Sequence, residues 1–205
     1  MSLRDNIINE SLKLFSLKGF LSTSLQDILK AANTSKGGFY NHFQSKEDLF
    51  FHVMDEARTI WRDRNLAGLD QIEDPVDKVK QLIENYYERY LKDSENFPGG
   101  CIFITLMVEL VDQRPHLAND INRGWMGFKR LIQRHLEAGK AAGKLRSDVN
   151  TEAVTEILFA GILGASVNYG VEKSDDSLGK TVNSLIDYRN GGNRKGLCRS
   201  SQGHG

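Results

Sequence analysis

The stretch AANTSKGGFYNHFQSKEDLF, near the amino end, holds the residues whose types and spacing best suit contact with a polyanion. Two adjacent glycines, Gly37 and Gly38, each cost a helix interior about 1 kcal/mol relative to alanine, so they indicate that the backbone there lies close against something. Lys36, Tyr40 and Asn41 flank them at helical spacing. A basic residue, bare backbone, a phenol and an amide on one exposed face can hold phosphate oxygens and reach the base edges of DNA.

Three short helices are expected to position this face. Apolar residues spaced from Ile8 onward predict a first helix that ends at Gly19, a residue suited to a C-terminal cap. The segment TSLQDILKAA predicts a second helix, with Thr23 and Gln26 at capping-box spacing. The residues NTSK then form a turn, and a short third helix covers about residues 35–43. Three helices with a four-residue turn have the layout of a helix-turn-helix.

The spacing also assigns the two faces of the third helix. Phe39 and Phe43 are four residues apart and are expected to enter the core of the three-helix unit, which turns the polar face outward. Asn41 or His42 then reaches a base edge. Lys46, in the first turn of the next helix, lies unfavourably in the field of the helix dipole, and a nearby phosphate would offset this. The alternative is a helix-turn-helix that serves only as a structural corner.

Helical spacing continues beyond this unit, and no alternating strand pattern bounded by hairpin signals occurs. The longer helical segments span about residues 75–94, 99–113, 115–143 and 150–171. We therefore predict an all-α protein, with a helix-turn-helix domain in residues 1–50 and a helical bundle in residues 51–188. Residues 189–205 are basic and rich in glycine with one aliphatic side chain. Burial cannot offset the entropy of ordering them, so we expect a disordered tail.

Composition narrows the class of protein. Hydrophobic residues make up 40% of the chain and charged residues 26%, and the formal net charge is zero, so any surface for nucleic acid must be local. The longest apolar runs, CIFITLMVELV and ILFAGILGASV, fall short of the roughly 20 residues that cross a bilayer. The start, MSLRDNIINE, is charged too early for a signal peptide. Because two cysteines make no disulfide framework, we expect a cytoplasmic protein without a membrane segment.

No pattern for catalysis or for metal binding appears. The five histidines show no HExxH or similar spacing, and no Gly-x-Ser-x-Gly motif occurs. The tail sequence GGNRKG lacks the spacing of a phosphate-binding loop. We therefore expect neither an enzyme nor a bound metal or cofactor.

The segment GFLSTSLQDILKAANTSKGGFYNHFQSKEDLF resembles the DNA-binding segment of the tetracycline-repressor (TetR/AcrR) family of one-component regulators. It has the Gly-aromatic pair, a Thr-Ser at the second helix start, the pattern Ser-Lys-Gly-x-aromatic-Tyr-x-x-Phe, and then Ser-Lys-Glu-x-Leu. It departs from the pattern at Asn33 and Thr34, where Gly-Val is commoner. The resemblance covers about residues 5–52, and the remainder fits the family's variable effector domain only in the number and lengths of its helices.

This resemblance implies a homodimeric regulator, most often a repressor, that binds a palindromic operator in double-stranded DNA and is released by a small ligand. The two recognition helices of such a dimer lie about 34–36 Å apart. The implied phosphate contacts are Thr23, Lys36, Tyr40 and Lys46, and the implied positions at or near the major groove are Ser35, Gly37, Asn41 and His42. A second interpretation stays open, a helical sensor or adaptor that acts through protein contacts without DNA. Affinity for DNA that falls steeply with salt would separate the two.

Small residues in FAGILGASVNYG indicate a close helix–helix contact. Ala160, Gly161, Gly164 and Ala165 are placed on one helical face by their spacing. By the resemblance, this helix and the last helix form a four-helix dimer interface, and the alternative is tight packing within one chain. The glycine-rich, basic end of the chain departs from the family pattern, which leaves the strength of the dimer open.

Aromatic and sulfur-bearing side chains at helical spacing are candidates to line the ligand pocket, although the same spacing suits a plain core. They are Tyr86, Tyr87, Tyr90, Phe103, Met107, Trp125, Phe128 and Phe159. Glu109 is expected either to orient a polar group of the ligand or to pair with an arginine.

Cys101 follows Pro98-Gly99-Gly100, so it is expected in the first turn of a helix, where the dipole lowers the pKa of a thiol. The sequence around it, GGCIFITLMVEL, resembles the segment after the pocket-entry loop in a TetR subgroup that includes sensors of electrophiles and oxidants. We therefore expect release by a small molecule or an electrophile. The alternative is that Cys101 is a buried small hydrophobic residue.

Overall fold

The computed structural model describes residues 2–172 together with residues 180 and 184. Every element in this part of the chain is helical, which confirms the predicted all-α fold. The elements are α1 (Leu3–Lys18), α2 (Leu25–Ala31), α3 (Lys36–Tyr40), α4 (Lys46–Asn65), the 3-10 turn η1 (Leu69–Gln71), α5 (Pro75–Asn85), the π-helical segment η2 (Tyr86–Leu91), α6 (Ile102–Leu110), α7 (Pro115–Ala141) and α8 (Thr151–Glu172). Most of the pattern SLGKTVNSLIDY and all of the predicted tail (residues 189–205) lie outside the described residues.

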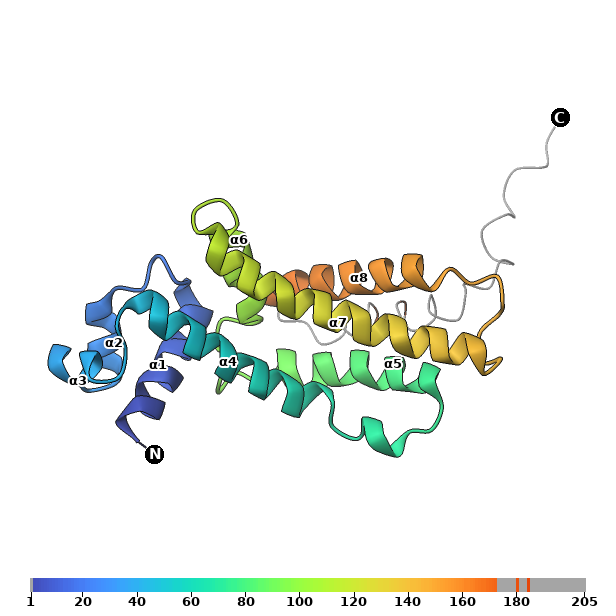
Figure 1. Ribbon diagram of the computed structural model, residues 1–205, viewed down its shortest axis with the longest axis horizontal. Coiled ribbons are helices and arrows are strands. Elements are labelled where there is room, and N and C mark those ends of the chain that lie inside the picture. The colour runs from blue at the N-terminus through green and yellow to red at the C-terminus, as the bar shows by residue number, and fades with distance from the viewer. Residues whose placement is uncertain (1, 173–179, 181–183, 185–205) are drawn as a thin grey trace.

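Helices α1, α2 and α3 gather at one end of an elongated molecule, and α5, α7 and α8 run side by side toward the other end (Figure 1). Each helix of the N-terminal unit begins at a serine whose hydroxyl accepts a hydrogen bond from the third helical N–H, as Ser24 does from Asp27 at 3.1 Å. The N-caps of α1 to α4 are Ser2, Ser24, Ser35 and Ser45. The Asp27 carboxylate in turn accepts a hydrogen bond from the backbone N–H of Ser24 at 2.8 Å, so the predicted capping pair of Thr23 and Gln26 is wrong by one residue.

Aromatic rings fill the core of the N-terminal unit. Phe39 and Phe43 are both buried, with ring centroids 5.5 Å apart, which confirms the face that their spacing predicted. Phe20 extends this cluster, meeting Phe15 at 5.4 Å and Phe50 at 5.3 Å in the edge-to-face geometry that aromatic pairs prefer. Because Phe50 belongs to α4, the start of α4 is part of the N-terminal unit.

Helix α4 joins the two parts of the chain without a break. Its first turns bury Leu49, Phe50 and Val53, and its later turns contact α5 and η2 in the bundle. The predicted boundary between residues 50 and 51 therefore falls inside one continuous helix. The physical reason is that the apolar stripe of α4 runs through both parts, so nothing ends the helix between them.

Helix α7 is central to the bundle and packs against α5, α6 and α8. The helix predicted over residues 75–94 is divided into α5 and the π-helical η2, which buries three tyrosines, Tyr86, Tyr87 and Tyr90. Segments of π-helix occur often at functional sites. The helix predicted over residues 99–113 is shortened to α6, with Cys101 as its N-cap rather than in its first turn.

Helix α8 is longer than the apolar runs considered in the sequence. Its 22 residues meet the length and hydropathy of a membrane span, which corrects the expectation that no segment is long enough. The same test is passed by core helices of globular domains, and α8 packs on α7 through buried side chains such as Leu158 and Ile162. Part of its surface is left open, as described below.

Candidate nucleic-acid interface and ligand cavity

The polar face of α3 lies on the surface, uncovered by any helix of the described chain. Lys36, Asn41 and His42 are exposed, and Tyr40 is 52% exposed. The Tyr40 ring stands edge-on against the buried ring of Phe39, with the centroids 5.3 Å apart, which anchors it to the core. The predicted outward orientation is confirmed, and the exposed groups include an ammonium, a phenol, an amide and an imidazole.

The two glycines of α3 serve different purposes. A Cβ atom added at Gly38 would lie 2.4 Å from the Thr34 hydroxyl oxygen, so this glycine lets α3 lie close to the preceding turn. A Cβ atom at Gly37 would meet nothing closer than Ser35 Oγ at 3.8 Å, which is an ordinary contact. The close approach that the two glycines indicate is therefore, at Gly38, an approach to the chain's own Thr34. The fold does not require a glycine at position 37, whose bare backbone is exposed.

We predict that Gly37→Ala separates stability from DNA binding. Alanine favours the helix by about 1 kcal/mol, and its methyl group has room in the free protein, so the free energy of unfolding should stay equal or rise. The same methyl group would stand between the backbone and a bound duplex, so operator affinity should fall about tenfold. Denaturant unfolding and fluorescence anisotropy with a labelled operator measure the two effects. Unchanged affinity would show that this backbone does not approach DNA.

A shallow hollow between α2 and α3 adjoins the polar face. Its lining is Gln26, Leu29, Lys30, Asn33, Thr34, Ser35 and Lys36. Two of these residues are lysines and none is acidic, so the hollow suits a phosphate group. Lys30 was not predicted, because only the angle between α2 and α3 brings it beside Lys36. Asn33 has a left-handed backbone conformation with φ of 48°. Asparagine adopts this conformation more readily than most residues, which explains how it can stand where the family pattern more commonly has glycine.

Two residues predicted to touch phosphates make hydrogen bonds within the chain. Thr23 is fully buried and its hydroxyl donates to the Gly19 carbonyl at 2.6 Å, so its side chain is not exposed in this arrangement. Lys46 Nζ donates to the carbonyl oxygens of Phe20 at 2.9 Å and of Thr23 at 2.8 Å, and lies over the Phe20 ring. Burial lowers the pKa of Lys46, and the nearby Glu109 carboxylate opposes that shift. Lys46 therefore supports the connection between α1 and α2.

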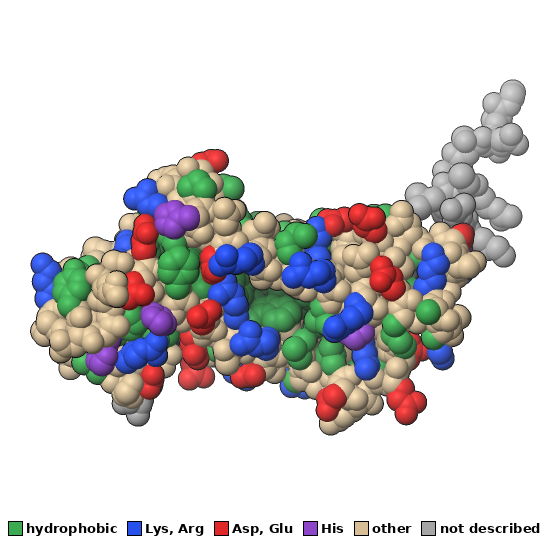
Figure 2. All heavy atoms as spheres, viewed as in Figure 1, with side chains coloured by type: hydrophobic (Ala, Val, Ile, Leu, Met, Phe, Trp, Pro, Cys, Tyr) green, Lys and Arg blue, Asp and Glu red, His purple; other side chains and the backbone are tan. Residues whose placement is uncertain are grey.

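A cavity of about 210 Å³ opens between α4, α6, α7 and α8. Six of the predicted pocket residues line it, namely Tyr86, Cys101, Phe103, Trp125, Phe128 and Phe159. Figure 2 shows a hollow with a hydrophobic floor near the middle of the molecule, with basic side chains along its edge. Trp61 meets Phe128 edge-on at 4.9 Å, so the floor is built largely from aromatic rings. Such a lining favours a ligand with an apolar body.

The remaining lining residues were not predicted, because tertiary packing alone brings their helices together. They are Arg58, Trp61, Arg62, Ile121, Gly124, Gly127, Leu131, Ile162 and Leu163. The sequence does hold one signal for them. Gly124 and Gly127 stand three residues apart inside a long helix, where glycine is unfavourable. Like Gly37, they therefore indicate that another group lies close to the backbone.

Three candidates for the pocket lie outside its lining. Tyr90 stands behind Cys101, with its hydroxyl 3.6 Å from Sγ, and burial raises the pKa of this phenol. Tyr87 is fully buried, and Met107 is partly buried on α6. The interpretation as plain core therefore fits these residues. Cys101 is itself buried, in agreement with the alternative that treats it as a small hydrophobic residue, but its side of α6 faces the cavity.

Glu109 joins α6 to the N-terminal unit. Its Oε2 accepts a hydrogen bond from the backbone N–H of Phe20 at 2.7 Å, and its Oε1 accepts one from Leu21 at 2.9 Å. The carboxylate sits against Gly19, where an added Cβ atom would lie 2.5 Å from Oε1. Among the described residues, Glu109 therefore neither lines the cavity nor pairs with an arginine, which differs from both expectations. Together with Lys46, it holds the connection between α1 and α2 through backbone groups.

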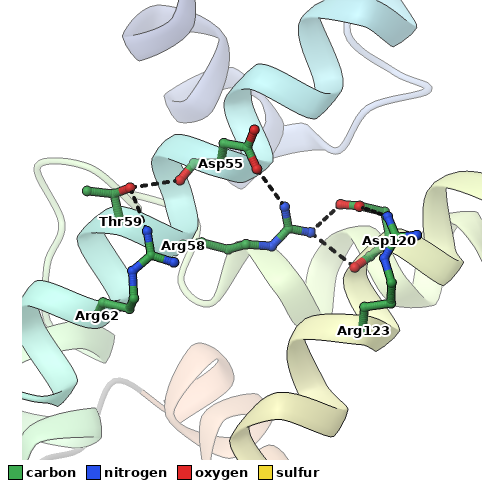
Figure 3. A network of polar contacts seen from close by, with 6 residues as sticks. All are labelled: Asp55, Arg58, Thr59, Arg62, Asp120 and Arg123. Carbon is green, nitrogen blue, oxygen red and sulfur yellow. Dashed lines mark hydrogen bonds and ion pairs between the residues drawn. The ribbon is translucent and has the colours of Figure 1, made fainter.

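Arg58 ties α4 to α7 at the edge of the cavity (Figure 3). Its guanidinium donates to the Asp120 carboxylate, to the Asp120 backbone carbonyl at 3.0 Å and to Asp55 at 2.9 Å. Asp120 is buried and also accepts a bond from Arg123. The charge of Arg58 is therefore largely balanced, and its side chain is held in one orientation.

Helix α8 presents small and apolar residues away from the bundle. Ala160 and Gly164 are exposed, Gly161 is partly exposed, and a Cβ atom added at Gly164 would meet nothing within 4 Å. Ala165 is only 3% exposed, so it packs inside the chain and does not belong to the predicted interface. Exposed apolar side chains continue the open stripe at Ile157, Val167 and Val171. Of the four predicted small residues, only Ala165 is explained by packing within the described part of this chain.

Comparison with known proteins agrees with this geometry. Residues 7–53 match the domain described as bacterial regulatory proteins, tetR family, and residues 75–185 match the tetracyclin repressor-like C-terminal domain. The two matches cover most of the chain, which belongs to the TetR family of transcriptional regulators. The members of this family are regulators rather than enzymes, they bind operator DNA, and they are typically dimers that respond to small molecules.

Similar proteins cover nearly the whole chain. The transcriptional repressor DhaR of Mycobacterium sp. (strain GP1) is 24% identical over 175 residues, or 85% of this chain and 86% of that protein. The repressor NemR of Escherichia coli (strain K12) is 24% identical over 189 residues, or 91% and 92%. The crystal structure of a TetR-family regulator from Cytophaga hutchinsonii has the same fold, with a TM-score of 0.83 at 22% identity over 92% and 93%. The predicted function, a transcriptional regulator, is confirmed.

Proposed function

We propose that this regulator is a repressor that binds a palindromic operator as a homodimer and leaves the DNA when a small molecule occupies the cavity. The exposed face of α3 carries the proposal, because Gly37 leaves open space there that the fold does not need. Lys36 and Tyr40 would hold phosphates, and Asn41 and His42 would reach base edges. Ser35, as the N-cap of α3, would lie near the groove. Because a protein that binds an operator must have access to the DNA, we also propose that it acts in the cytoplasm.

We assign DNA binding to residues 1–50, and effector binding and dimerisation to residues 51–188, with α4 shared between them. The open stripe of α8 supports the dimer. Small residues at Ala160, Gly161 and Gly164 allow a second helix to approach closely, and the apolar residues around them would be covered in the pair.

Helix α6 is suited to carry the signal from the cavity to the DNA-binding domain. Cys101 and Phe103, at its start, line the cavity, and Glu109, near its end, holds the backbone of Phe20 and Leu21. A ligand that displaces the start of α6 would therefore move the α1–α2 connection, and with it the orientation of α3. Such a shift between two packed arrangements is a common form of allosteric coupling.

Selection of bound duplexes from a random DNA library with the purified protein tests the proposed function. The expected result is a palindrome whose half-sites are centred about one helical turn or a multiple of it apart, because a two-fold dimer presents two recognition helices. Affinity for the selected duplex should fall steeply with salt. Recovery of no enriched sequence would contradict DNA binding, and an enriched but asymmetric site would contradict the symmetric dimer.

We predict that N-ethylmaleimide reaches Cys101 through the cavity and releases the operator. The thiol adds across the carbon–carbon double bond of the reagent, and the bulk that it gains must displace α6 or the aromatic floor. Cys101→Ser should stay on the operator after treatment, as measured by anisotropy and by the mass of the modified peptide. Cys198→Ser serves as the control, because it removes the other cysteine and leaves Cys101 in place. Equal release of both variants would remove Cys101 from the mechanism.

A further inference from the structure

The charges at the cavity point to the chemical class of its ligand. Among its described lining residues, Arg58 and Arg62 alone are charged. Arg58 is balanced by Asp55 and Asp120, as described above. Arg62 donates to the Thr59 hydroxyl at 3.1 Å, and it forms no ion pair with any carboxylate in the part of the chain that the structure describes. Within the described residues, the edge of the cavity therefore carries one exposed guanidinium, that of Arg62, without a paired carboxylate, and Figure 3 shows its bond to Thr59.

We propose that the cavity binds a small organic anion with an apolar body, with its carboxylate or equivalent group at Arg62 and its body on the aromatic floor. This inference rests on the proposed function, in which the cavity holds the effector. A guanidinium donates two parallel N–H bonds to a carboxylate, which makes it well suited to such a group. A cationic ligand of the same shape would face two arginines and no acidic residue in the lining. A neutral ligand would leave Arg62 without an anionic partner.

Two glycines of α7 support the same ligand. A Cβ atom added at Gly124 or Gly127 would meet nothing closer than 3.9 Å, and the neighbouring atom at Gly124 is Nε of Arg58. Packing of the described chain therefore does not require glycine at either position, while each glycine costs the helix about 1 kcal/mol. Both glycines line the cavity, and their missing side chains leave room there. That room is where the proposal places part of the apolar body of the ligand.

The cavity carries its own spectroscopic probes. Trp61 and Trp125 both line it, and they are the only two tryptophans of the sequence. Fluorescence of the full-length protein should therefore report occupancy without any DNA present. The probes are a graded series of phenylalkanoates, from phenylacetate to phenylhexanoate, each compared with its primary amide and its amine. At least one acid should quench the tryptophan fluorescence saturably. Its affinity should be about tenfold or more above that of its amide, and its amine should not bind.

Three variants separate charge from shape. Arg62→Leu should lower the affinity for the acid about tenfold or more and leave the amide nearly unchanged, because only the anion pairs with the guanidinium. Arg134→Leu removes an exposed arginine of the same molecule outside the lining and should change neither. Gly127→Leu fills the cavity and should abolish binding of every probe. Thermal unfolding of each variant shows that it is folded.

The proposal is overturned if no acid quenches saturably below about 1 mM, if acid and amide bind equally, or if Arg62→Leu leaves the acid unaffected. Release of a selected operator is measured separately with the best acid. Quenching by an acid without any operator binding would keep the ligand class and reject the regulator. Operator binding without preference for the acid would keep the regulator and reject the ligand class.

Discussion

Replacing Glu109 with glutamine should loosen the N-terminal unit from α6 and lower the free energy of unfolding by about 3 kcal/mol. The carboxylate accepts from two consecutive backbone N–H groups, of Phe20 and Leu21, and hydrogen bonds to a charged group contribute about 1.5–3 kcal/mol each. Glutamine keeps the shape, but its NH₂ group must face one of these donors. Lys46 also loses a neighbouring carboxylate. Chemical denaturation measures the loss, and amide hydrogen exchange should accelerate at Phe20 and Leu21.

A matched substitution shows whether the effect belongs to this contact. Glu95→Gln changes an exposed glutamate, so it should alter stability by less than about 0.5 kcal/mol. Exchange at Phe20 and Leu21 that stays as slow as in the unchanged protein would mean that Glu109 does not hold the connection. In the proposed mechanism, Glu109→Gln should also weaken the response of operator binding to modification of Cys101, since the signal passes along α6.

Replacing Gly164 with arginine should leave the monomer folded and lower operator affinity about a hundredfold or more. A Cβ atom added at Gly164 meets nothing within 4 Å in the described part of the chain, so the fold leaves open space there. In a dimer built on this stripe, the same side chain would place a bulky charge between two closely packed helices. A dimer binds two half-sites at once, because binding of one subunit keeps the other at a high effective concentration beside its half-site. A monomer lacks this gain in affinity.

Sedimentation velocity and operator anisotropy measure the two results. Gly170→Arg is the control, because a Cβ atom added there also meets nothing within 4 Å in the described part of the chain, and because helical spacing places Gly170 outside the open stripe of Ile157, Ala160, Gly161, Gly164, Val167 and Val171. It should remain dimeric. A dimeric Gly164→Arg protein would place the interface elsewhere, and a partner other than a second copy on this face, including lipid, would then be the explanation to examine for the exposed apolar stripe.

The part of the site that depends on neighbours in sequence was predictable. The outward face of α3 follows from the four-residue spacing of Phe39 and Phe43, because one helix turn fixes both directions at once. The N-cap of α4 at Ser45 follows in the same way from local hydrogen bonding. The cap of α2 was predicted one residue too early, at Thr23 rather than Ser24. Either hydroxyl can cap a helix, and Thr23 is buried by packing that its sequence neighbours do not reveal.

The parts that depend on distant segments were not predictable from spacing. Glu109 lies 89 residues from Phe20, and Arg58 lies 62 residues from Asp120. The residues next to Glu109 or Arg58 in the sequence do not indicate the partner, because the local preferences of a glutamate or an arginine do not depend on which distant residue it contacts in the folded chain. The same holds for Lys46, whose ammonium donates to two backbone carbonyls of the α1–α2 connection.

The amino-acid sequence by itself determined the all-α class, the helix-turn-helix and its polar face, since these follow from helical periodicity, caps and glycine within short windows. Only the tertiary structure decided which of the two glycines of α3 is free of packing, which aromatic side chains line a cavity, and that two arginines stand at its edge. Those features arise where α4, α6, α7 and α8 meet, and their positions depend on the packing of side chains far apart in the chain.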